Sequence, residues 1–118
     1  MSRVLVVEDD PEVAPALCGI LEHYGHTCSF VTNGTEAFAA LNGDAIDAVV
    51  TDVRLPGRIS GIEIAERARA AGIGCVLITG YGEAMSELEH RQHCIWLSKP
   101  FRSSQLADAV DAAIQSSD

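Results

Sequence analysis

Acidic side chains follow two of the short apolar runs in this sequence. Glu8 and Asp9 come directly after the run Val4–Val7, and Asp52 follows Ala48–Thr51. Carboxylates crowded into one site repel each other, and the repulsion pushes one of them toward its protonated form. A hard divalent cation such as Mg²⁺ removes this repulsion, because it takes oxygen ligands and typically binds one or two carboxylates together with a phosphate. The three acids therefore predict a site for Mg²⁺ (or Mn²⁺) that also accepts a phosphoryl group.

The only lysine of the chain also follows an apolar run. Lys99 comes after Ile95–Ser98 and precedes a proline. Its compact ammonium can pair with Asp52 and then with a phosphoryl oxygen. Thr79 ends another apolar run, and the neighbouring Gly80 leaves room for a ligand. Its hydroxyl is a candidate donor to a second phosphoryl oxygen, and side-chain packing is the alternative role.

These residues need a framework that brings distant segments to one edge. Short apolar runs without polar alternation are typical of strands buried on both faces of a parallel sheet. We predict such strands at Val4–Val7, Ala48–Thr51, Cys75–Thr79 and Ile95–Ser98, and a more polar strand nearer an edge at Thr27–Val31. In open α/β sheets, ligands bind beyond the carboxyl ends of the strands. The acids, the threonine and the lysine all follow or end such runs, so we expect them to converge there.

Helical patterns fill the gaps between the predicted strands. Asp10 is a candidate N-cap for the first helix, with Pro11 at the first helical position. Pro15 would remove a backbone hydrogen bond one turn into this helix, and it therefore predicts an irregular first turn or a later helix start. Further helices are expected after Asn33-Gly34, after the capping box Ser60/Glu63 with an exit at Gly72, over Glu83–His90, and from Ser103 or Ser104. A strand–helix pair repeated five times predicts an α/β fold with helices on both faces of a parallel sheet.

Length and composition restrict the class of protein. The chain has 118 residues, of which 47% are hydrophobic, so we expect one globular domain over residues 1–118. Its net charge of -9 argues against a nucleic-acid-binding module and against a basic membrane anchor. No apolar run approaches the roughly 20 residues of a membrane span, and the start does not resemble a signal peptide. We therefore expect a cytoplasmic protein.

Cysteines and histidines offer alternative sites. The four cysteines are spread along the chain without a C-x-x-C pair, at Cys18, Cys28, Cys75 and Cys94. We expect them to be buried thiols, and a disulfide or a metal site is the alternative interpretation. The pairs His23-x-x-His26 and His90-x-x-His93 have a spacing that could bind zinc, but no acid or cysteine completes either cluster. Placement at helix C-terminal ends is favoured for both pairs.

Four segments of the chain are similar in type and order to motifs of one family. They are Glu8-Asp9-Asp10-Pro11, Thr51-Asp52-Val53-Arg54-Leu55-Pro56-Gly57, Ile78-Thr79-Gly80 and Ser98-Lys99-Pro100-Phe101. Together they resemble the receiver domains of bacterial two-component response regulators, and the resemblance covers essentially the whole chain. It implies a flavodoxin-like, doubly wound (βα)5 fold with a five-stranded parallel sheet in the order 2-1-3-4-5.

The resemblance also implies roles for the acids. Asp52 would be the phosphoacceptor, attacking a phosphoryl group carried on a partner histidine. Glu8 and Asp9 would hold Mg²⁺ together with Asp52, and the backbone carbonyl of Arg54 would be a further ligand. The Arg54 side chain follows Asp52 by two residues and is a candidate modulator of the phosphoryl group, with a solvent-exposed role as the alternative.

A second group of residues corresponds to the family's response to phosphorylation. Thr79 and Lys99 would contact the phosphoryl oxygens. Trp96 falls at the position of the family's switch aromatic, which is more often tyrosine or phenylalanine, and Gly80 and Tyr81 are candidate modulators. The implied response is an inward movement of Thr79 that gives Trp96 room to rotate.

The function predicted from these features is a signalling phosphoacceptor without a DNA-binding output domain. It would receive its phosphoryl group from a histidine kinase or a histidine phosphotransfer protein, and pass the signal to a downstream protein by contact. It would catalyse only its own phosphorylation and dephosphorylation. One alternative is a receiver cut from a larger hybrid kinase or regulator, and another is an unphosphorylated binding module. A remote one is an aspartate-nucleophile phosphohydrolase, which usually has a second acid where this chain has Arg54.

Overall fold

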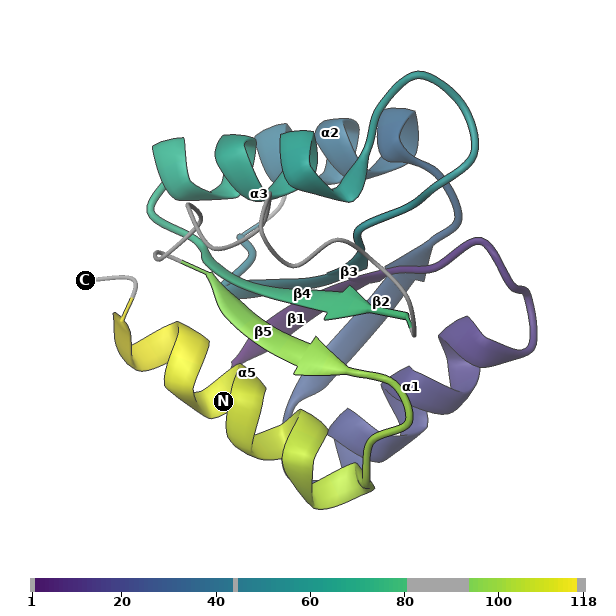
Figure 1. Cartoon of the computed structure of the whole chain (residues 1–118). Helices are drawn as coiled ribbons and strands as arrows, with labels where there is room; N and C mark the ends of the chain where they lie inside the picture. Colours follow the sequence, from purple (N-terminus) through teal and green to yellow (C-terminus); the bar gives the residue numbers. More distant parts are fainter. Residues whose placement is uncertain (1, 44, 81–93, 117–118) are drawn as a thin grey trace.

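Five parallel strands form the central sheet of the molecule (Figure 1). The structure is a computed structural model, and it describes residues 2–43, 45–80 and 94–116. The sheet order is β2-β1-β3-β4-β5, which confirms the predicted α/β fold class and its flavodoxin-like topology. The strands are β1 (Arg3–Val7), β2 (Thr27–Val31), β3 (Ala48–Asp52), β4 (Gly74–Thr79) and β5 (Ile95–Ser98).

The apolar character of each strand matches its place in the sheet. Strands β3 and β4 are buried along their whole length, as is β1 after its first residue. These three strands occupy the centre, where helices cover both faces and exclude water from both sets of side chains. The more polar β2 lies at one edge, as its composition predicted, and the half-buried β5 lies at the other.

Within the described residues, four helices cover the two faces of the sheet. Helices α1 (Val13–His23) and α5 (Ser103–Ser116) pack on one face, and α2 (Gly34–Gly43) and α3 (Gly61–Ala70) pack on the other (Figure 1). The helix predicted over Glu83–His90 lies outside the described residues. Each helix in the described part of the chain falls short of the length and apolar character that a membrane span requires.

Helix α1 begins later than its predicted cap. Asp10 and Pro11 lie ahead of the helix, which begins at Val13, so the assignment of Asp10 as its N-cap was wrong. The Asp10 carboxylate instead accepts a hydrogen bond at 2.9 Å from the backbone N–H of Glu12, which stabilises the turn before the helix. The late start puts Pro15 in the first helical turn, where a backbone N–H has no intrahelical acceptor to lose. This is the later start that Pro15 predicted.

Helix α3 has the ends that its sequence predicted. The Ser60 hydroxyl accepts a hydrogen bond at 3.2 Å from the backbone N–H of Glu63, which satisfies one of the free donors of the first turn. After the helix ends, Gly72 has a φ of +73°, a conformation that glycine adopts without steric cost. Local chemistry therefore sets both ends of the helix that follows the Asp52 loop.

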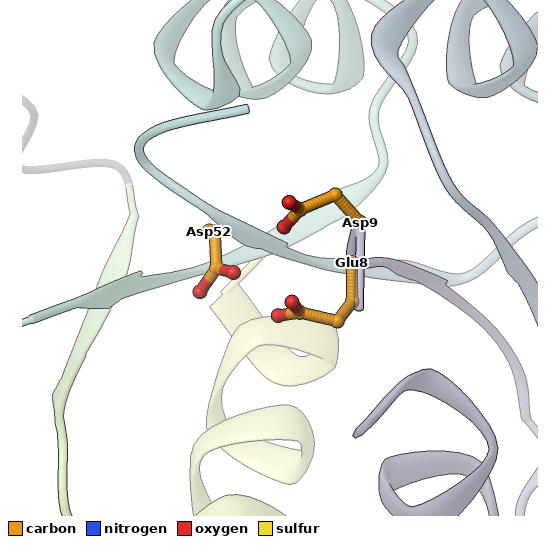
Figure 2. Close-up of side chains that lie close together, drawn as sticks. All are labelled: Glu8, Asp9 and Asp52. Atoms are coloured by element: carbon orange, nitrogen blue, oxygen red, sulfur yellow. The ribbon is translucent and has the colours of Figure 1, made fainter. Parts of the chain in front are cut away.

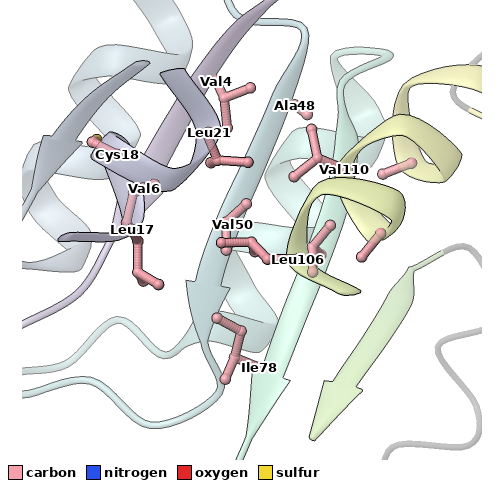
Figure 3. Packing of buried hydrophobic residues seen from close by; sticks show 13 residues of the cluster. Val4, Val6, Leu17, Cys18, Leu21, Ala48, Val50, Ile78, Leu106 and Val110 are labelled. Atoms are coloured by element: carbon pink, nitrogen blue, oxygen red, sulfur yellow. The ribbon is translucent and has the colours of Figure 1, made fainter. Parts of the chain in front are cut away.

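The buried side chains form two clusters, one on each face of the sheet. Alternate residues of each strand point to opposite faces, so Val4 and Val6 join one cluster while Leu5 and Val7 join the other. Figure 3 shows the cluster beneath α1 and α5, whose members include Val4, Val6, Leu17, Leu21, Val50, Ile78, Leu106 and Val110. Helices on both faces thus hold the strand ends in a fixed relation to one another.

The four cysteines are free thiols in this structure. Cys18, Cys75 and Cys94 are buried, as the sequence predicted, and Cys28 is half-buried on the edge strand β2. Each is surrounded by apolar side chains of one of the two clusters.

Candidate functional site

The strand register brings the predicted site residues to one edge of the sheet. Val7 of β1 lies opposite Thr51 of β3, so the residues that follow them, Glu8 and Asp52, are neighbours. Asp52 lies opposite Ile78 of β4. One residue farther along, Thr79 lies opposite Ser98 of β5, and Lys99 comes next. Four strand ends therefore deliver the acids, the hydroxyl and the ammonium to the same edge, as predicted.

Three carboxylates form a compact cluster at this edge. Glu8, Asp9 and Asp52 each place an oxygen within 4.8 Å of an oxygen of the other two. Figure 2 shows Glu8 and Asp9 leaving the end of β1 and pointing toward Asp52 at the end of β3. Glu8 and Asp52 are buried, with exposed fractions of 4% and 8%, whereas Asp9 is exposed. The cluster is therefore partly open to solvent, on the side where Asp9 lies.

Glu8 occupies an environment that disfavours its charge. Its Oε1 accepts a hydrogen bond at 3.1 Å from the backbone N–H of Asp10. Its Oε2 is buried and has no hydrogen-bond partner among the described residues. Burial, followed by the neighbouring Asp52 carboxylate, raises the pKa of Glu8 to about 7. Glu8 is therefore a carboxyl that burial, together with the neighbouring Asp52, pushes toward its protonated form.

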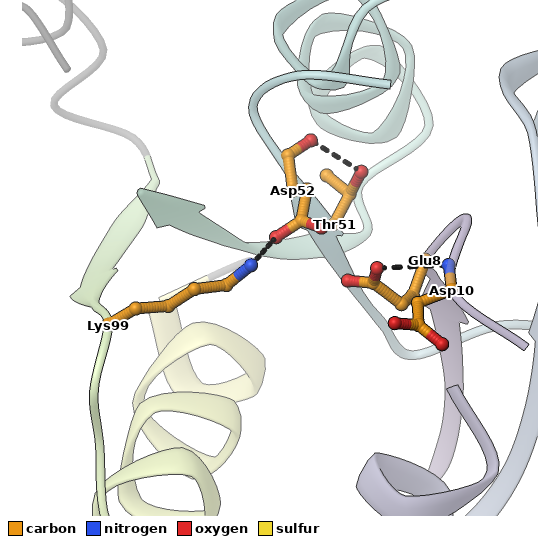
Figure 4. A network of polar contacts seen from close by, with 5 residues as sticks. All are labelled: Glu8, Asp10, Thr51, Asp52 and Lys99. Carbon is orange, nitrogen blue, oxygen red and sulfur yellow. Dashed lines mark hydrogen bonds and ion pairs between the residues drawn. The ribbon is translucent and has the colours of Figure 1, made fainter. Parts of the chain in front are cut away.

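Lys99 provides the positive charge of the site. Its Nζ lies 3.2 Å from Oδ1 of Asp52 (Figure 4). The Lys99 side chain is 46% exposed. The buried Oδ1 accepts no directed hydrogen bond among the described residues, so the contact is an ion pair rather than a hydrogen bond. The backbone carbonyl oxygen of Asp52 accepts a hydrogen bond at 3.0 Å from the Thr51 hydroxyl. The predicted pairing of Lys99 with Asp52 is present.

The acid cluster fits a hard divalent cation. Its donors are carboxylate oxygens, which Mg²⁺ and Mn²⁺ prefer. Two of these oxygens, Oε2 of Glu8 and Oδ1 of Asp52, are buried without a hydrogen bond from the described residues. Oδ1 of Asp52 has the ion pair with Lys99, but Oε2 of Glu8 has no partner among the described residues, and coordination of a cation would compensate the cost of its burial. The residues present are therefore suited to the metal that the sequence predicted.

The raised pKa of Glu8 predicts how stability depends on pH in metal-free protein. The folded protein holds the Glu8 proton up to about pH 7, whereas an ordinary glutamate releases it near 4.5. The free energy of unfolding should therefore fall as pH rises from 4.5 to 7, by about 1–3 kcal/mol. Urea unfolding in EDTA at pH 5 and pH 8 measures this loss.

The Glu8→Gln variant isolates the contribution of this carboxyl. It should lose less stability between the two pH values than the wild type, and Glu22→Gln on the exposed surface of α1 should behave like the wild type. Equal losses in the wild type and in Glu8→Gln would show that another group is responsible.

The remaining candidate residues surround the cluster at different depths. Thr79 is buried, and its hydroxyl donates to the Ser98 hydroxyl at 3.5 Å. This hydrogen bond links β4 to β5. Trp96 is half-buried and packs against the cluster beneath α2 and α3. Arg54 is exposed and Gly80 is half-buried. The predicted modulator Tyr81 lies outside the described residues.

Sequence reasoning missed one residue that shapes the site. Gly61, the first residue of α3, packs directly against the backbone of Asp52, and a Cβ there would collide with the Asp52 carbonyl oxygen. Its N–H also donates to the Val53 carbonyl oxygen at 2.9 Å. The only signal in the sequence was a glycine directly after the cap Ser60, where helix chemistry does not require one.

The zinc alternative gains no support from the described residues. There, the acid cluster is the one group of three or more His, Cys, Asp or Glu side chains that could hold a metal. Nε2 of His26 lies 3.2 Å from Oδ1 of Asp111, and the ring of His23 packs edge-on against Tyr24. The pair His90 and His93 lies outside the described residues.

Two curated regulators are similar in sequence to this chain. The transcriptional regulatory protein TcrA of Mycobacterium tuberculosis is 36% identical over 108 residues, which cover 88% of this chain and 42% of TcrA. The transcriptional regulatory protein FixJ of Azorhizobium caulinodans is 36% identical over 118 residues, covering 94% of this chain and 54% of FixJ. The chain thus spans about half the length of these relatives or less.

The fold and the family comparisons agree with this similarity. A crystal structure of a response regulator receiver protein from Sinorhizobium medicae superimposes with a TM-score of 0.89 at 30% identity, and covers 99% of this chain and 97% of that one. The sequence model described as "Response regulator receiver domain" matches residues 4–111. A match over that much of the sequence places the chain in the family of response regulator receiver domains.

Proposed function

We propose that this chain is a phosphoacceptor that takes a phosphoryl group onto Asp52 from a histidine kinase or a histidine phosphotransfer protein. The observation that carries the proposal is the placement of the buried Asp52 carboxylate between the Lys99 ammonium and the acids Glu8 and Asp9. A nucleophilic carboxylate with a cation on one side and a metal-binding pair on the other suits phosphoryl transfer, which depends on positioning and charge neutralisation.

The proposed reaction forms one bond and breaks another. A carboxylate oxygen of Asp52 attacks the phosphorus of a phosphohistidine, the P–N bond breaks, and the imidazole of the partner leaves. Lys99 stays beside the new acyl phosphate and pairs with its oxygens. Glu8, Asp9 and Asp52, with the backbone carbonyl of Arg54, would hold Mg²⁺ or Mn²⁺. When bound, that cation neutralises negative charge on the phosphoryl oxygens.

We further propose that the signal leaves by contact with a downstream protein. The Thr79 hydroxyl, now bonded to Ser98, would turn to a phosphoryl oxygen on Asp52. Its movement would change the packing around the half-buried Trp96 and hence the surface near β5. Arg54, Gly80 and Tyr81 remain candidate modulators, and the cytoplasmic setting and the extent of the domain stay predictions from the sequence.

The test of this function is phosphoryl uptake from a small donor. Incubation with acetyl phosphate and Mg²⁺ should add one phosphoryl group, measured as an intact-mass increase, and peptide mapping should place it on Asp52. Uptake should stop in EDTA and return with excess Mg²⁺. A protein that gains no phosphoryl group with Mg²⁺ present, or gains it elsewhere, would contradict the proposal.

Two neighbouring acids provide a matched test of the metal site. Asp9→Ala removes a carboxylate from the cluster and should weaken Mg²⁺ binding by roughly tenfold or more. A tenfold change in affinity corresponds to about 1.4 kcal/mol of binding free energy. Asp10→Ala removes a carboxylate that caps the turn at Glu12, so it should lower stability by about 1 kcal/mol and leave Mg²⁺ affinity nearly unchanged. Calorimetric titration with MgCl₂ measures both, and equal affinities in the two variants would reverse the assignment.

A further inference from the structure

Two cysteines from different elements are in direct contact away from the acid cluster. Cys18 of α1 and Cys28 of β2 have their Sγ atoms 2.6 Å apart. Cys18 is 8% exposed and lies within the cluster beneath α1 and α5 (Figure 3). Cys28 is half-buried on an edge strand, so solvent reaches the pair from its side. The two sulfurs can meet without rearrangement of the backbone.

The sulfur contact makes one of the two thiols easier to ionise. Each thiol can donate to the other, and donation by Cys28 leaves Cys18 as the acceptor. This hydrogen bond lowers the pKa of Cys18, because it stabilises the thiolate. The Cys28 thiol can alternatively donate to the Ser29 carbonyl oxygen at 3.7 Å, a longer contact than the one to Cys18. Thiolates are the nucleophilic form of cysteine, so Cys18 is the more reactive sulfur of the pair.

The second cysteine pair of the chain has a different environment. Cys75 and Cys94 also share a hydrogen bond, but both are buried, with exposed fractions of 2% and 4%. The contact with Cys94 and burial raise the pKa of Cys75 well above its usual range. A buried pair whose thiolate form is disfavoured should react slowly with an oxidant. Cys75 and Cys94 are therefore an internal comparison for Cys18 and Cys28.

We propose that Cys18 and Cys28 are a modification site, at which a hydroperoxide such as hydrogen peroxide converts the two thiols to an intramolecular disulfide. The Cys18 thiolate attacks one peroxide oxygen, the O–O bond breaks, and the products are a sulfenic acid and hydroxide, which takes a proton to become water. The Cys28 sulfur then attacks the Cys18 sulfur, the S–O bond breaks, and a second water leaves with the Cys28 proton. Two thiols lose two electrons, and one peroxide gains them.

The site lies away from the phosphoryl chemistry. In the register of β1 and β2, Cys28 lies opposite Val4, whereas Glu8 follows Val7 at the other end of the strand. The disulfide would join α1 to the edge strand without involving an acid of the cluster. Its formation is therefore a property separate from the proposed phosphoacceptor role.

The sequence permits a direct test by peptide mapping. Glu22 lies between the two cysteines, so a glutamate-specific protease places Cys18 in peptide 13–22 and Cys28 in peptide 23–36. The full chain is treated with hydrogen peroxide, remaining thiols are alkylated, and the protein is digested without reduction. In most of the protein, these two peptides should be joined and should carry two hydrogens fewer than the separate peptides. Dithiothreitol should separate them.

Variants identify the sulfurs that are responsible. Cys18→Ser and Cys28→Ser should each abolish the joined peptides, and Cys75→Ala should retain them. Far-UV circular dichroism establishes whether each variant is folded. If a variant does not fold, peptide mapping of the wild type alone tests whether Cys18 and Cys28 form the disulfide. The proposal is overturned if the wild type forms sulfinic acid at separate peptides, joins Cys75 or Cys94 instead, or forms only dimers between chains on a non-reducing gel.

Discussion

Replacing Asp52 with asparagine is expected to abolish phosphoryl uptake from acetyl phosphate in the presence of Mg²⁺. The amide has nearly the same size as the carboxylate, but it lacks the anionic oxygen that would attack phosphorus. It also cannot form the ion pair that Asp52 makes with Lys99 at 3.2 Å. The expected result is an unchanged intact mass for the variant under conditions in which the wild type gains one phosphoryl group.

Asp10→Asn is the matched control for this experiment. Asp10 belongs to the same acidic segment as Glu8 and Asp9, but its carboxylate is bonded to the Glu12 backbone and is not part of the cluster. The control should therefore take up phosphoryl groups as the wild type does. Phosphoryl uptake by Asp52→Asn that maps to another residue would mean that the nucleophile has been misassigned.

Replacing Gly61 with alanine is expected to destabilise the fold by about 2 kcal/mol or more. The added Cβ would collide with the Asp52 carbonyl oxygen and would lie 2.9 Å from Cα of Val53. Both neighbours are backbone atoms of the segment that carries Asp52, so neither can move aside as a flexible side chain would. Relief of the collision has to separate α3 from the end of β3. We therefore expect slower phosphoryl uptake together with the loss of stability.

Gly19→Ala is the control for the general effect of glycine replacement. Gly19 is exposed in the middle of α1, and a Cβ there would have nothing within 4 Å. Alanine should stabilise that helix by up to about 1 kcal/mol. Urea unfolding of the two variants should give changes of opposite sign, and wild-type stability for Gly61→Ala would show that the close approach to Asp52 is not required.

The strands and the composition of the site could be predicted from the sequence alone. Continuous apolar runs such as Ala48–Thr51 predict buried strands because a strand between two layers of helices has no water-facing side. The acids and Lys99 follow such runs directly, and parallel strands end at a common edge, so the sequence alone predicts that these side chains converge. The capping box of Ser60 and Glu63 was equally local, because donor and acceptor lie within one helical turn.

Other features depend on contacts between segments that are distant in the sequence. The sequence did not predict which of Glu8 and Asp9 would be buried; Glu8 is buried beside Asp52, and its pKa is raised for that reason. Gly61 had no visible role until α3 packed on the Asp52 backbone. Asp10 was wrongly assigned as the N-cap of α1 because it has the chemistry of a cap, whereas its carboxylate accepts a hydrogen bond within the turn before the helix.

Residue type and spacing thus determined which groups reach the functional edge. Tertiary packing decided which of these groups are buried, and which side chains from separate elements come into contact. Cys18 and Cys28 show the difference most directly. They have no motif spacing, and their sulfurs touch only because α1 packs against the edge strand β2. Contacts of this kind form when a helix packs on a sheet, and local periodicity does not specify which side chains of the two elements meet.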